Sequence, residues 1–253
     1  GKAPTGVAVI LAAADNKVSK PARDIAGPSL DKALAAADFK SKANAVAEVL
    51  VPGGTALDRL LVVGTGKPEE LDESAWLKLG GTVASKLGKA KTASVLLELD
   101  GAAISAGSAA DFALGVLLRS YAFDKYKTKK DDNGKPDKAA KITILTNDPA
   151  GAKRQFASRQ SVYEGVALAR DLVNEPANML GTLEFADKAA ALSSLGVKIT
   201  TLGEKEMKKL GMGALLGVAQ GSVRPPRMVI MHWNGGKAKG KPIAFVGKGV
   251  VFD

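Results

Sequence analysis

The first part of the chain alternates short apolar runs with segments in which apolar residues recur every three or four positions. The apolar runs predict strands, and the periodic segments predict helices. The predicted strands are residues 7–13, 59–63, 94–99 and 141–146, and the predicted helices are residues 29–39, 72–87 and 106–121. Strands that alternate with helices indicate a sheet covered by helices. We therefore predict an α/β domain over residues 1–151.

The pattern changes after this domain. From residue 152 onward, Phe156, Val162, Val166 and Val173 follow a helical spacing, and this helix should end near Asn174 because Pro176 disfavours helical geometry before it. The further predicted elements are a helix over 182–195 capped by Thr182, a strand over 197–202, a short helix over 204–210 and a strand over 228–233. We assign the connecting helix and all that follows to a second domain, residues 152–253.

The last stretch joins an apolar run to a lysine and an aspartate. Residues 243–246 predict a strand buried on both faces, with Lys248 and Asp253 at its carboxyl end, where open α/β sheets place their ligand sites. A neutral lysine amine and a carboxylate can share a divalent cation. A second interpretation is that Lys248 extends to water while Asp253 caps the next element. From the residues of this stretch alone we favour the second interpretation.

Composition limits the chemistry. The chain has 253 residues, 46% of them hydrophobic, which suffices for a substantial core. No apolar run reaches the roughly 18 residues that span a bilayer, so we expect no membrane segment and a cytoplasmic location.

The absence of cysteine excludes disulfides, thiolate zinc sites and cysteine nucleophiles. The single histidine, His232, lies in an apolar run, so we predict that it is a core or strand-edge residue. A metal site would therefore use carboxylates, backbone and an amine.

The net charge of +10 raises the question of nucleic-acid binding. The lysines are spread along the chain, and the one dense segment, residues 124–141, mixes seven lysines with four aspartates. We interpret it as a solvated loop or hairpin tip. DNA binding stays an alternative that a steep salt dependence would support.

Two shorter motifs each allow two interpretations. Gly64 and Gly66 follow a predicted strand, but the third glycine of a dinucleotide fingerprint is absent, so we interpret them as a strand-ending turn. Arg224 and Arg227 flank a pair of prolines. These prolines either aim an arginine at a carboxylate or turn the chain into the strand over 228–233, and we favour the turn.

Four stretches in the last 85 residues or so, taken in order, resemble one known family. They are residues 170–178, 207–221, 222–227 and 246–253, and the family is that of the leucyl aminopeptidases, also called cytosol aminopeptidase or aminopeptidase A. This resemblance implies an amino-terminal macro-domain-like α/β domain, joined by a helix to the opening part of an α/β metallopeptidase domain.

The resemblance also implies a site. Lys248 and Asp253 would be ligands of two divalent metal ions, Mn²⁺ or Zn²⁺, with Asp253 bridging them. The metals would activate water that removes amino-terminal residues, preferentially leucine, from peptides with a free amino terminus, with bicarbonate as general base. Family members form homohexamers. Since their other ligands lie further along the chain, we expect residues 1–253 alone to be inactive, and a DNA-binding or structural, hexamer-forming module is the alternative function.

Overall fold

The computed structural model describes residues 5–128, 140–236 and 240–250. The chain divides into two compact units, residues 1–168 and 169–253. The predicted domain boundary after residue 151, which assigns the connecting helix to the second part, stays a prediction. Among the described residues, no helix combines the length and apolar character needed to cross a bilayer.

The described residues of the first unit include a five-stranded sheet in the order β2-β3-β1-β4-β5. Neighbouring strands are parallel except β2, which runs antiparallel to β3 at one edge. The strands are β1 Gly6–Ala13, β2 Val46–Leu50, β3 Leu57–Gly66, β4 Thr92–Leu96 and β5 Lys141–Leu145. The helices around them are α1 Lys20–Ala26, α2 Leu30–Ala36, α3 Glu73–Lys86 and α4 Ala106–Ser120. The predicted α/β architecture is confirmed.

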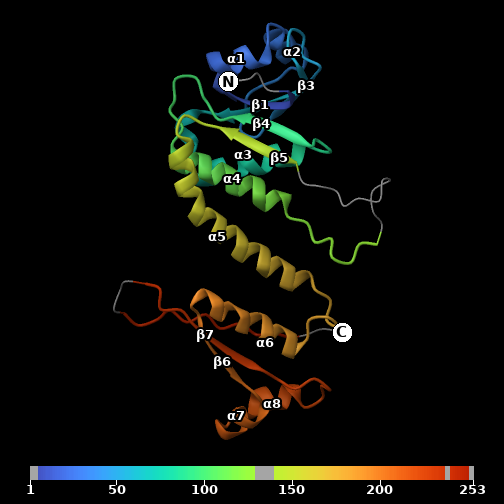
Figure 1. The fold of residues 1–253 in the computed structure, drawn as a ribbon, viewed down its shortest axis with the longest axis vertical. Coiled ribbons are helices and arrows are strands. Elements are labelled where there is room, and N and C mark those ends of the chain that lie inside the picture. The colour runs from blue at the N-terminus through green and yellow to red at the C-terminus, as the bar shows by residue number, and fades with distance from the viewer. Residues whose placement is uncertain (1–4, 129–139, 237–239, 251–253) are drawn as a thin grey trace. The chain divides into compact units, whose positions relative to one another are not determined.

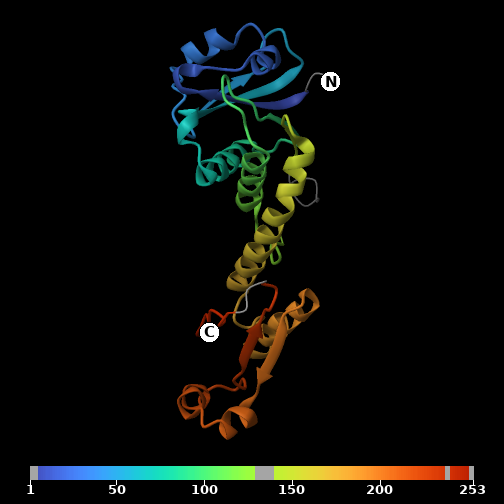
Figure 2. The same cartoon turned by 90° about the vertical axis from the view of Figure 1, so that its left-hand side faces the viewer.

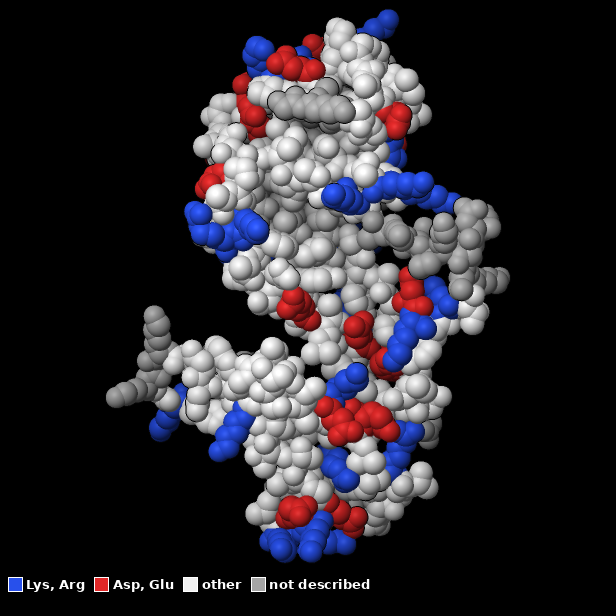
Figure 3. All heavy atoms as spheres, in the orientation of Figure 1, with Lys and Arg blue, Asp and Glu red and all other residues white. Residues whose placement is uncertain are grey.

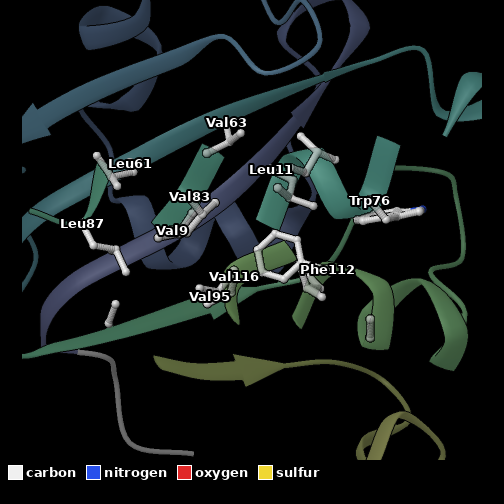
Figure 4. Close-up of a cluster of buried hydrophobic side chains, with 14 of the residues drawn as sticks. Val9, Leu11, Leu61, Val63, Trp76, Val83, Leu87, Val95, Phe112 and Val116 are labelled. Carbon is white, nitrogen blue, oxygen red and sulfur yellow. The ribbon is translucent and has the colours of Figure 1, made fainter. Parts of the chain in front are cut away.

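Helices cover both faces of this sheet. Figure 1 shows α1 and α2 on one side and α3 and α4 on the other, and Figure 2 shows the same layers from the side. The central strand β1 supplies both cores, because its side chains alternate between the faces. Val9 and Leu11 enter the cluster with Phe112 of α4, whereas Ile10 enters the cluster with α1 and α2. Figure 4 shows the first of these clusters.

Two elements of the first unit had no clear signal in the sequence. β2 is an edge strand in which only Ala47 is buried, so it lacks the continuous apolar run of a central strand. The buried residues of α1 are two alanines, Ala22 and Ala26, which give little periodic signal. The predicted turn at Gly64 and Gly66 is wrong, because β3 runs on through both glycines and ends only at Gly66.

Glycines allow α3 and α4 to approach closely. A Cβ atom on Gly80 would overlap the carbonyl oxygen of Phe112, and one on Gly115 would overlap the carbonyl oxygen of Leu77. Only glycine leaves room for this backbone-to-backbone contact. The contact buries Trp76, Leu79 and other α3 side chains between the helix pair and the sheet.

The helix α5, Pro149–Asn174, follows β5 and confirms the predicted long helix. Its first turn is capped by Asp148, whose Oδ1 accepts the backbone N–H of Gly151 at 2.8 Å. Arg159 fastens α5 to α4, because its Nε donates to Oδ1 of the buried Asp111 at 2.8 Å. This ion pair lies within the first unit.

The described part of the second unit contains a two-stranded antiparallel sheet and three short helices. The strands are β6 Lys198–Leu202 and β7 Met228–His232, and the helices are α6 Thr182–Ala190, α7 Glu204–Lys209 and α8 Gly213–Ala219. A 3₁₀ segment, Ala191–Leu195, extends α6 to the predicted end. The elements predicted between residues 182 and 233 are thus present, whereas α8 had not been predicted. Among the described residues of this unit, the buried apolar residues are Ala186, Ala189 and Met207.

Two local predictions for the second unit are wrong. The residue before α6 is Gly181, and its N–H donates to the Glu184 carboxylate at 3.0 Å. Thr182 is already helical, and its hydroxyl donates to the carbonyl of Pro225 at 2.8 Å instead of capping the helix. The predicted strand over 243–246 is absent: this segment is neither helix nor strand, and Phe245 is 92% exposed. In the described part of the unit β6 and β7 pair only with each other, so this apolar run has no neighbouring strand to bury it.

Candidate functional site

The predicted metal ligands lie at the end of the chain. Lys248 is in the exposed segment 242–250, which forms no helix or strand. Asp253 lies outside the described residues. The role of both residues as metal ligands therefore stays a prediction. The buried strand that we predicted directly before Lys248 is absent, and the residues around Lys248 are exposed.

The described residues alone do not assemble a metal centre. Among residues 5–128, 140–236 and 240–250, no three His, Cys, Asp or Glu side chains come together in a group that would hold a metal ion. Lys248 is an accessible nitrogen donor, but one amine cannot offset the dehydration of a divalent cation. The donor set fits a divalent metal only when oxygen ligands join the amine.

His232 ends β7 and is exposed, opposite Lys198 in the register of the two strands. The strand-edge interpretation is therefore confirmed.

Two of the stretches that carry the family resemblance meet in the second unit. Arg224 donates from Nη1 to Glu184 Oε2 at 3.4 Å and from Nη2 to the backbone carbonyl of Asn178 at 3.3 Å. The guanidinium thus ties the turn after α5 to the start of α6. Both interpretations of the arginine pair hold in part, because Arg224 reaches a carboxylate and the segment also leads the chain into β7.

Hydrogen bonds lower the pKa of Glu184. The largest contribution comes from the backbone N–H of Glu184 itself; burial opposes it by raising the pKa, and the Gly181 N–H and the Arg224 charge lower it further. A carboxyl group with a lowered pKa in the folded state stabilises the fold above its unfolded pKa, and this stabilisation is lost as pH falls through the folded pKa.

We therefore expect Glu184→Gln to lower the urea midpoint of the second unit slightly at pH 7 and to lower it less at pH 3, which lies below the unfolded glutamate pKa of about 4.3. Unfolding followed by circular dichroism at both pH values measures this. Asp187→Asn is the matched control, because Asp187 is an exposed carboxylate on the same helix and makes no ion pair with the described residues, so this change should leave the midpoint unaltered at both pH values. A Glu184→Gln effect that is equal at both pH values would contradict the prediction.

On the face shown in Figure 3, basic and acidic side chains are interspersed, and they form no extended patch of one charge. In the lysine-rich segment, residues 129–139 lie outside the described residues. Of its described lysines, Lys127 pairs with Asp124, and Lys125 Nζ lies 5.3 Å from the centre of the Tyr126 ring. The loop interpretation of the whole segment stays a prediction.

Comparison with known proteins covers both parts of the chain. Residues 9–130 match the sequence model of the cytosol aminopeptidase family, N-terminal domain. Residues 167–253 match the model of the cytosol aminopeptidase family, catalytic domain. The second match includes Lys248 and Asp253.

Individual relatives agree with these matches. A probable cytosol aminopeptidase of Chelativorans sp. is 54% identical over 253 residues, which are 99% of this chain and 51% of the relative. A solved mutant of tomato leucine aminopeptidase has a TM-score of 0.70 at 25% identity, over 88% of this chain and 46% of that one. The bottromycin maturation enzyme BotP, in complex with Mn, has a TM-score of 0.65 at 23% identity, over 90% of this chain and 44% of that one, and shows the shared fold.

The chain thus spans about half the length of the curated relatives it matches. The two domain models match in the order in which they occur in the family, and together they cover most of the sequence. Residues 1–253 belong to the cytosol aminopeptidase family.

Proposed function

We propose that this chain is the amino-terminal domain and the opening part of the catalytic domain of a metal-dependent aminopeptidase. The observation that carries the proposal is the catalytic-domain match over residues 167–253, which ends on the Lys248 and Asp253 motif. The substrates are peptides with a free amino terminus, and leucine is the preferred first residue.

In this proposal Lys248 and Asp253 are ligands of two divalent ions, Mn²⁺ or Zn²⁺. When bound, such a pair activates water and polarises the scissile carbonyl. Lys248 contributes a neutral amine, and its exposure keeps it accessible to a metal and to further ligands. Asp253 contributes carboxylate oxygens, which hard divalent ions favour. Residues 1–253 hold too few ligands for a complete dinuclear site, so we expect this chain alone to be inactive.

Leucine p-nitroanilide hydrolysis tests the proposal. We expect residues 1–253 alone to show no activity in added Mn²⁺. A hybrid that joins residues 1–253 to the remaining half of the Chelativorans relative should be active, and a chelator should abolish that activity. Manganese is the first choice, since BotP was solved in complex with it. A hybrid that keeps full activity in chelator would overturn the metal-dependent mechanism.

Within the hybrid, Lys248→Ala should lower kcat/KM by at least about 100-fold, because an incomplete coordination shell holds the metal weakly. Lys241→Ala is the matched control, as Lys241 is an exposed lysine in the same segment without helix or strand. It should leave kcat/KM within about twofold. Equal effects of the two substitutions would contradict a ligand role for Lys248.

The family also supports three finer statements, which we include in the proposal. They are a cytoplasmic location, a homohexameric assembly and the use of bicarbonate as general base. DNA binding or a purely structural role is not favoured, since the observation that carries the proposal is a match to a catalytic domain.

A further inference from the structure

The first unit contains a crevice where its sheet topology reverses. β1 and β3 are parallel neighbours, with Val9 opposite Leu61. The chain leaves β1 for α1, which packs on one face, and leaves β3 for α3, which packs on the other. Loops that diverge in this way at the carboxyl ends of adjacent strands open a crevice, which is where open α/β sheets bind ligands.

Three segments line this crevice. They are residues 14–16 after β1, residues 40–43 before β2, and Gly66 at the end of β3 with Lys67 and Glu70 after it. The volume is about 420 Å³, within the range of small-molecule sites. All three segments belong to the first unit.

Hydrogen bonds hold the walls in place. The backbone N–H of Asn16 donates to the Ser41 hydroxyl at 3.0 Å, and the backbone N–H of Ser41 donates back to the Asn16 side-chain oxygen at 3.0 Å. Gly66 N donates to the Ser41 carbonyl at 2.9 Å. A wall fixed from both sides is pre-organised, which lowers the entropic cost of binding a ligand.

The backbone of the crevice is held in unusual geometry. Asp15 and Asn16 have positive φ angles of 61° and 56°, a left-handed geometry that is uncommon for residues other than glycine. A Cβ on Gly64 would overlap the carbonyl oxygen of Lys42, so the lysine-bearing wall lies directly against the end of β3. Such geometry persists only where surrounding contacts enforce it, and it concentrates at functional sites.

The crevice is lined by both lysines and carboxylates, which could bind a ligand that carries a phosphate next to hydroxyl groups. Lys40, Lys42 and Lys67 line the crevice. Lys40 pairs loosely with Asp38 at 3.8 Å, and Lys67 pairs with Glu70 at 3.5 Å. In the described part of the chain Lys42 makes no ion pair, and neither does Asp15. An uncommitted ammonium group attracts a phosphate, and an uncommitted carboxylate accepts hydrogen bonds from hydroxyl groups.

We propose that this crevice binds a small sugar phosphate, with the phosphate on Lys42 and its neighbouring lysines and a sugar hydroxyl on Asp15. This binding does not rest on the proposed function.

A chemical-shift titration of the whole chain with ribose 5-phosphate at low ionic strength tests this proposal. We expect saturable shifts of the Asn16, Ser41 and Gly66 amides with a Kd of about 1 mM or tighter, as expected for a ligand of this size. Ribose without the phosphate should not bind. Inorganic phosphate should bind at least about fivefold more weakly, because it makes no hydroxyl contact with Asp15.

Two substitutions separate the roles. Lys42→Ala should weaken ribose 5-phosphate binding at least about fivefold, whereas Lys78→Ala, an exposed lysine of α3 outside the crevice, should not. Asp15→Gly, which suits the positive φ, should weaken ribose 5-phosphate but not inorganic phosphate. No saturable shifts, equal effects of the two lysine substitutions, or equal affinity for inorganic and sugar phosphate would each overturn the proposal. Lys42 and Asp15 are exposed, and circular dichroism verifies that each variant is folded.

Discussion

Gly80→Ala should destabilise the first unit by about 3 kcal/mol, the upper end of the usual cost of overpacking. The added methyl group would overlap the carbonyl oxygen of Phe112 and approach the backbone N of Val116. Both obstacles are backbone atoms of α4, so a side-chain rotation cannot relieve the overlap and the helices must separate. Separation would loosen the cluster around Phe112, which is fully buried. The overpacking cost exceeds the roughly 1 kcal/mol that alanine gains over glycine in a helix.

Urea unfolding followed by the fluorescence of the buried Trp76, in a Trp233→Phe background, measures this loss within the first unit. Gly81→Ala is the matched control on the same helix. A Cβ there would meet its nearest atom, the Gly115 carbonyl oxygen, at 3.7 Å, which is ordinary contact. Gly81→Ala should therefore be neutral or stabilising by up to about 1 kcal/mol. If both variants unfold at the wild-type midpoint, α3 and α4 do not approach as closely as described.

The second large effect is expected at the Arg159–Asp111 ion pair. Arg159→Ala should cost about 2 kcal/mol, because it leaves the Asp111 carboxylate, whose side chain is only 7% exposed, without its cation. The loss should be smaller than for a fully buried pair, since the Arg159 side chain is 25% exposed to solvent. The hydrogen bond with Asp111 raises the pKa of Arg159, opposed by burial. The guanidinium thus stays charged throughout the neutral range.

The same fluorescence assay measures this variant. Arg154→Ala removes an exposed arginine five residues earlier on α5 and should change the free energy of unfolding by less than about 0.5 kcal/mol. Combining Arg159→Ala with Asp111→Leu should recover most of the loss, because no unpaired carboxylate then remains buried. A double variant less stable than Arg159→Ala would show that the unpaired charge is not the cause.

In the first unit, the confirmed predictions are strands that are buried on both faces and helices that are buried along one face. Val7 to Ala13 is a continuous apolar run, and such a run becomes a central strand because both of its faces are covered. The spacing of Trp76, Leu79 and Val83 predicts α3, since these side chains share one buried face. The same logic was wrong for residues 243–246, because an apolar run is buried only where neighbouring strands and helices exist to cover it.

The sequence by itself determined the α/β class, the order of most elements and the family resemblance, because these depend on local periodicity and on contiguous motifs. It also named Lys248 and Asp253, although only through that resemblance. Only the tertiary structure decided which glycines form the α3–α4 contact, that Arg159 reaches Asp111, and that Asn16, Ser41 and Lys42 meet at the ends of β1 and β3. Such pairings join residues far apart in the chain, and the order in which strands enter the sheet brings them together.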